Sequence, residues 1–122
     1  MIAVEIVHTS VHIADMKIAG VEWDEGNWPK CGKHGVSQEE IEFVLENMTF
    51  RIADPNPMEQ RFRTAGRAQS GRVVFVVYTY RTQGRTQGAR TFLRPISARF
   101  MHPKEVREYE QIEKAMADTG KR

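Results

Sequence analysis

Arginine dominates the part of the sequence that is best suited to bind a phosphate group. From Gln60 to Pro103 the chain has nine arginines, no lysine and no acidic residue. Arginine's planar guanidinium can donate two parallel hydrogen bonds to a phosphate, whereas lysine acts as a point charge. We expect roughly half of these arginines to pair with helical carboxylates and the others to form a basic sheet face, with nucleic acid as the leading partner. The nine are Arg61, Arg63, Arg67, Arg72, Arg81, Arg85, Arg90, Arg94 and Arg99.

Residues that could bind a metal or form a disulfide are sparse. Cys31 is the single cysteine, so the chain cannot form an internal disulfide, and a lone cysteine is usually a small buried residue. His8 and His12 have the i, i+4 spacing of two metal ligands on a helix, but no second ligand cluster accompanies them. The β-branched residues around them favour a strand instead. We therefore expect no metal and no other cofactor.

Composition indicates one globular domain. The 122 residues carry a net charge of +2, and the hydrophobic content of 40% and charged content of 28% are ordinary for a soluble protein. No apolar run is long enough to span a membrane, and no export signal stands out at the N-terminus. We expect a cytoplasmic protein with one domain at 16–122, preceded by a weakly attached extension at 1–15 that ends before a second methionine, Met16.

Residues 72–81 predict the central strand of a sheet. They form an almost unbroken apolar, β-branched and aromatic run with Gly71 before it and Gly84 after it. Such a run is typical of a strand that is buried on both faces. Alternation then places Val73, Phe75, Val77 and Thr79 on one face and Val74, Val76, Tyr78 and Tyr80 on the other.

The segments before the central strand predict two helices and three further strands. A short strand at 21–23 leads to a helix that Asp24 or Asn27 caps and that ends near Lys33. A capping box at 37–40 begins a second helix, whose apolar stripe runs through residues 41, 44, 45 and 48. Strands at 50–54 and 60–67 follow, and the second of these pairs with the central strand in a hairpin.

The segments after the central strand complete the sheet and add a helix. The last strand runs from 90 to 100, and Pro95 requires an edge or a bulge there because it has no backbone N–H to donate. Pro103 opens a C-terminal helix with a narrow apolar stripe. The order predicts an α+β fold, in which an antiparallel meander sheet carries two N-terminal helices and one C-terminal helix.

Five short motifs stand out by their order and spacing: Glu22-Trp23-Asp24, Lys33-His34-Gly35-Val36-Ser37, Ala65-Gly66-Arg67, Ile96-Ser97-Ala98-Arg99 and Glu108-Tyr109-Glu110. Together they resemble the BrnT toxin family of bacterial type II toxin–antitoxin modules. This family consists of small ribonucleases with a RelE-like fold, and the resemblance runs from Met16 to about Gln111. It implies cleavage of RNA that inhibits translation, a BrnA-type antitoxin that neutralises the toxin in a hetero-oligomer, and DNA binding only through that antitoxin.

The implied reaction needs three kinds of group. These are a base for the 2′-hydroxyl, cations for the phosphate and an acid for the leaving 5′-oxygen. Arginines at the strand ends are the candidates for a phosphate clamp, an adjacent lysine and histidine for the acid or base, and a tyrosine for positioning. The catalytic candidates are Lys33, His34, Arg67, Arg81, Arg99 and Tyr109, and the RNA-binding candidates are Arg61, Arg63, Arg85, Arg90 and Arg94.

Simpler roles stay open for some of these residues and for the whole chain. His34 could cap the carbonyl groups of a helix end, and Tyr109 could serve only in packing. The protein could be a non-catalytic RNA- or DNA-binding module, or an interaction protein whose arginines bind an acidic partner. No helix-turn-helix, RNP or zinc-ligand pattern favours the DNA- or RNA-binding module.

Overall fold

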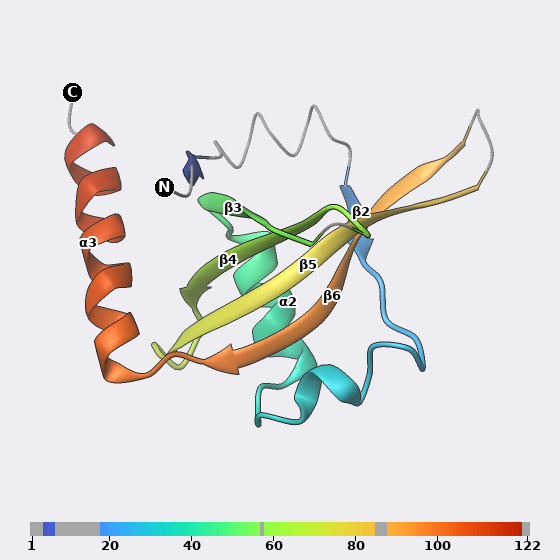
Figure 1. The fold of residues 1–122 in the computed structure, drawn as a ribbon, viewed down its shortest axis with the longest axis horizontal. Coiled ribbons are helices and arrows are strands. Elements are labelled where there is room, and N and C mark those ends of the chain that lie inside the picture. Colours follow the sequence, from blue (N-terminus) through green and yellow to red (C-terminus); the bar gives the residue numbers. More distant parts are fainter. Residues whose placement is uncertain (1–3, 7–17, 57, 85–87, 121–122) are drawn as a thin grey trace.

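A six-stranded sheet organises the protein, in the order β1-β3-β4-β5-β6-β2 (Figure 1). The computed structural model describes residues 4–6, 18–56, 58–84 and 88–120. The strands are β1 (Val4–Ile6), β2 (Ile18–Val21), β3 (Phe50–Asp54), β4 (Arg61–Arg67), β5 (Val73–Gln83) and β6 (Arg90–Phe100). The predicted antiparallel meander is confirmed for β3 to β6, whereas β2 pairs with β6 in parallel.

Two α-helices pack on this sheet, and a 3-10 turn lies beside β6. They are α2 (Gln38–Glu46), α3 (Pro103–Gly120) and the 3-10 turn η1 (Lys30–Gly32). The capping box at the start of α2 is present: the Ser37 hydroxyl accepts from the Glu40 backbone N–H, and the Glu40 carboxylate accepts from the Ser37 N–H. The α+β class is therefore confirmed.

The first predicted helix is wrong, because residues 24–33 form turns and one short 3-10 turn. Asn27 does not cap a helix there. Its buried side-chain amide donates instead to the backbone carbonyls of Glu22 and Pro95. Pro29, which has no N–H, and two nearby glycines also disfavour an α-helix. The preceding strand lies at Ile18–Val21 rather than at 21–23, because the chain turns at Asp24.

The expected N-terminal extension contributes one short strand. Val4–Ile6 forms β1, which pairs antiparallel with Phe50–Ile52 of β3. The positions of His8 and His12 lie outside the described residues, as does that of Arg85.

The central strand β5 is buried more fully on one face than on the other. Val74, Val76 and Tyr78 have no exposed surface, and they pack in one core with α2. On the opposite face Val73 is buried with Tyr109 of α3, but Phe75 and Val77 are only half-buried. Complete burial of both faces was therefore a wrong prediction. The reason is that α3 stands only at the end of the sheet where β5 begins (Figure 1).

Strand register gathers arginines on the sheet face opposite α2, and we call this set the arginine face. The predicted bulge is present: Tyr78 pairs with Pro95 but Val77 pairs with Ser97, so Ile96 is the extra residue. The bulge brings Arg94 onto the same face as Arg99. The arginine face consists of Arg61, Arg63, Arg67, Arg81, Arg90, Arg94 and Arg99. Arg72 lies on the other side and stacks on Phe100, 3.4 Å from the ring centroid.

Candidate functional site

At the α3 end of the arginine face, α3 supplies carboxylates to two predicted catalytic arginines. Arg67 Nε and Nη2 each donate to the Glu113 carboxylate at 3.1 Å. Arg99 donates from both terminal nitrogens to Glu105 at 2.7 Å each. The face therefore has little free positive charge here, because each guanidinium already has an anionic partner.

Tyr109 lies between these two ion pairs and is almost fully buried. Its ring packs against Phe50, and the Arg67 guanidinium lies 5.7 Å from its centroid. Burial, with the neighbouring Glu113 carboxylate, raises the pKa of Tyr109 to about 12. Its hydroxyl is therefore protonated at neutral pH. A cavity of about 200 Å³ beside it is lined mostly by apolar side chains, including Ile52 and Phe75.

The Arg99–Glu105 pair should make stability depend on acid pH. Hydrogen bonds from Arg99, and then from the His102 backbone, lower the pKa of Glu105 from 4.5 to about 2. A lowered folded-state pKa means that this contribution is present above about pH 4.5 and is lost as the pH falls towards 2. Because the pair is about one-third exposed, we expect it to be worth about 1 kcal/mol.

Urea unfolding from pH 6 to pH 2 measures this contribution. Glu105→Gln should remove about 1 kcal/mol at pH 6 and flatten the loss of stability in acid, whereas Glu108→Gln, on the exposed surface of α3, should do neither. An identical acid profile in wild type and Glu105→Gln would contradict the role of this pair.

The opposite end of the arginine face contains a polar pocket of about 180 Å³. Arg61 of β4 and Arg81 of β5 line it, together with Lys30 from η1 and Glu59, which precedes β4. Glu59 accepts from Arg61 Nε and Nη2 at 3.4 Å each, which is a long contact. Lys30 and Arg81 are exposed. This pocket therefore combines several cations with one loosely held carboxylate.

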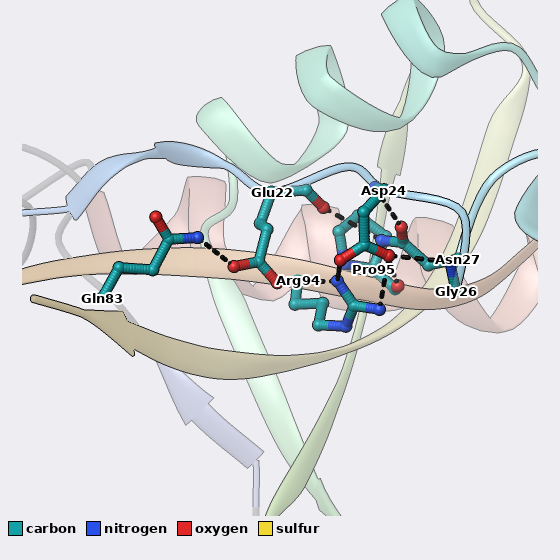
Figure 2. A network of polar contacts seen from close by, with 7 residues as sticks. All are labelled: Glu22, Asp24, Gly26, Asn27, Gln83, Arg94 and Pro95. Carbon is teal, nitrogen blue, oxygen red and sulfur yellow. Dashed lines mark hydrogen bonds and ion pairs between the residues drawn. The ribbon is translucent and has the colours of Figure 1, made fainter.

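Arg94 also borders this pocket, but a network of polar contacts engages its guanidinium (Figure 2). It donates to Glu22 at 2.6 Å and to both oxygens of Asp24 at 2.9 Å. Its side chain is only 14% exposed. Hydrogen bonds from Arg94 also hold the pKa of Asp24 below its usual value. Gln83 donates to the same Glu22 carboxylate, so the network joins β5, β6 and the loop after β2.

The structure separates the predicted catalytic residues into distant groups. Arg99 of β6 pairs with Phe75 of β5, and Arg81 lies six residues farther along β5. At the usual rise per residue of a strand, this places Arg81 about 20 Å from Arg99. Arg67, Arg81 and Arg99 therefore cannot hold one phosphate together. Lys33 and His34 follow η1 and are exposed, and neither lines the two cavities described above.

The remaining RNA-binding candidates differ in whether a carboxylate pairs with the guanidinium. Arg63 pairs with Asp54 at 2.6 Å, whereas Arg90 is exposed, with its guanidinium 5.3 Å from the Phe92 ring centroid. Among the described residues, five of the eight arginines of the acid-free block form ion pairs. Of these eight, only Arg67 and Arg99 pair with helical carboxylates, which is fewer than the predicted half.

Sequence reasoning missed two residues of the polar pocket. Glu59 is the last acid before the acid-free block and lies two positions before Arg61, which places both on one side of an extended chain. That spacing could have predicted that Glu59 lies beside Arg61. Lys30 gave none, because the turn that carries it was predicted to be a helix. Among the described residues, no group of three or more His, Cys, Asp or Glu side chains could hold a metal.

Comparison with known proteins identifies the family. The family model for the BrnT ribonuclease toxin of type II toxin–antitoxin systems matches residues 23–105, which contain β3 to β6, α2 and the polar pocket. No curated protein and no solved structure matched the chain. Within the described ranges, no helix is long and apolar enough to cross a membrane. The chain therefore belongs to the BrnT family: it is a ribonuclease toxin of a type II toxin–antitoxin system, with RNA as its substrate and an antitoxin as its partner.

Proposed function

We propose that this toxin binds RNA across the arginine face and cuts it without a metal ion, which inhibits translation. The observation that carries the proposal is the register of β4, β5 and β6, which directs seven arginines to one face of the sheet. Cations placed around a phosphate stabilise the charge that develops in the transition state, and side chains can supply the acid and the base. The arginine face supplies such cations from the protein alone.

Two parts of the arginine face are candidates for the reaction centre. One is the α3 end, where Arg67, Arg99 and Tyr109 have the roles that the sequence predicted; RNA could reach these arginines only in competition with Glu105, Glu110 and Glu113. The other is the polar pocket at the opposite end. Lys33 and His34 remain proposed acid or base groups, provided that the bound RNA reaches the segment after η1.

The proposal includes the setting in which the toxin works. A BrnA-type antitoxin would neutralise it in a hetero-oligomer and would supply all contact with DNA. The toxin would act in the cytoplasm, and its fold would be of the RelE-like type, with residues 16–122 as the toxin domain. The antiparallel meander with helices on it, described above, supports that classification.

Cleavage in the presence of a chelator tests the metal-free reaction. Toxin freed of its antitoxin should cut a labelled RNA equally well with and without excess EDTA, because side chains supply the charges. Addition of purified antitoxin should stop the cleavage, which excludes a contaminating nuclease. Activity that disappears with EDTA and returns with a divalent ion would contradict the metal-free mechanism. RNA that is bound but stays intact would favour a non-catalytic binding module.

A further inference from the structure

The two ends of the arginine face differ in how much positive charge is free. At the α3 end Arg67, Arg99 and Arg63 each face a carboxylate at 3.1 Å or less. At the polar pocket, Lys30 and Arg81 form no ion pair with a carboxylate of the described residues, and Arg61 has only its long contact to Glu59. A phosphate would bind more readily where it need not displace a carboxylate.

We propose that the polar pocket is the reaction centre, with the scissile phosphate bound by Lys30, Arg61 and Arg81 and with Glu59 as the general base. This inference rests on the proposed function and specifies where on the arginine face the reaction occurs. It adds two catalytic residues, Lys30 and Glu59, that the sequence did not predict.

Glu59 is suited to the role of base because its carboxylate lines the pocket and is only loosely held by Arg61. Among the described residues that line the pocket it is the one carboxylate, and its side chain is 36% exposed. Its contacts with Arg61 are 3.4 Å long, whereas Glu105 is held by Arg99 at 2.7 Å through both oxygens. A loosely held carboxylate can accept a substrate proton, but a carboxylate engaged in two short charged hydrogen bonds is poorly available.

The proposed step balances with the side chains of the pocket. The 2′-hydroxyl proton passes to the Glu59 carboxylate as the 2′-oxygen forms a bond to phosphorus. The bond from phosphorus to the 5′-oxygen breaks, and that oxygen takes a proton from the Lys30 ammonium. The products are a 2′,3′-cyclic phosphate and a free 5′-hydroxyl, and exchange with water restores both side chains. Arg61 and Arg81 stabilise the extra negative charge on the phosphate in between.

The loop that carries Lys30 is held in place beside β6. Asn27 is buried, and its amide donates to the carbonyls of Glu22 at 2.9 Å and Pro95 at 3.0 Å. The Arg94 pairs with Glu22 and Asp24 fix the start of the same loop (Figure 2). One wall of the pocket is therefore set by the fold before RNA arrives, which is the arrangement that preorganised charge stabilisation requires.

Matched variants of the two ends test this assignment. Glu59→Gln and Arg81→Gln should each lower the single-turnover rate of RNA cleavage on the order of 10²-fold or more. Binding of an RNA with a 2′-deoxy group at the cleavage position should weaken less than about tenfold, since Arg81 is one of several phosphate contacts. Arg67→Gln and Arg99→Gln should cut within about tenfold of wild type. Arg107→Gln, on the exposed face of α3, is the charge-matched control and should cut normally.

Two further readouts separate a catalytic role from a structural one. Glu59→Asp should recover part of the rate lost in Glu59→Gln, and the rise of the rate with pH that reports the base should disappear in Glu59→Gln. Circular dichroism should give the same melting temperature for both variants as for wild type. The cleavage product should carry a 2′,3′-cyclic phosphate.

The outcomes distinguish this inference from the proposed function. If Glu59→Gln and Arg81→Gln cut RNA at the wild-type rate in EDTA, while Arg67→Gln or Arg99→Gln loses 10²-fold or more, the reaction centre lies at the α3 end. The pocket assignment is then overturned and the proposed function stands. If folded wild-type toxin cuts no RNA in EDTA, both are overturned.

Discussion

Replacement of Arg94 by glutamine is expected to destabilise the protein by about 3 kcal/mol, because it leaves a nearly buried carboxylate without its cation. Glu22 and Arg94 are only 13% and 14% exposed, and their contact is 2.6 Å. Urea unfolding at neutral pH measures the change. The matched control is Arg90→Gln, in the same strand and on the same face but exposed, which should cost less than about 0.5 kcal/mol.

The same variant links the fold to the reaction. Loss of the Arg94 network should loosen the loop that carries Lys30, so cleavage should fall even at temperatures where Arg94→Gln is fully folded. If Arg94→Gln is as stable as Arg90→Gln, the network does not anchor the loop. The sequence-based role of Arg94 in RNA binding would then regain support.

Replacement of Ile41 by alanine is expected to cost about 3 kcal/mol through lost burial and the cavity left behind. Ile41 has no exposed surface and packs from α2 into the main core with Val74 and Tyr78 of β5. Chemical denaturation should show the full loss, and Glu46→Ala, on the exposed side of α2, should change stability by less than about 0.5 kcal/mol. Equal stability of these two variants would mean that α2 contributes little to the core.

Most of the fold was predictable because its signals are local. The strands at 50–54 and 90–100, and the start of α3 at Pro103, follow the sequence-based boundaries. Ser37 and Glu40 predict the start of α2 through a capping box, and both of its hydrogen bonds are present. These elements depend on alternation, helical periodicity and capping, which a single sequence displays directly.

The failures come from contacts between residues far apart in the chain. Asn27 could have capped a helix, but its amide bonds Pro95, a partner 68 residues away. The structure also separates the three arginines that were predicted to bind one phosphate together, because β5 is 11 residues long and Arg81 lies near the end of it that is far from Arg67 and Arg99. The sequence alone also does not show which carboxylate pairs with each arginine, as Glu113 does with Arg67.

The bulge at Ile96 sets the phase between the two halves of β6. Arg94 and Arg99 are five residues apart, so regular alternation would point them to opposite faces, and the single extra residue cancels that mismatch. Deletion of Ile96 would therefore shift the side-chain alternation of one half of β6 relative to the other half. Either the half with Phe92 and Arg94 or the half with Ser97 and Arg99 would turn over towards α2. A one-residue change in length at this position would turn either Arg90 and Arg94 or Arg99 away from the arginine face, while every arginine remained in the sequence.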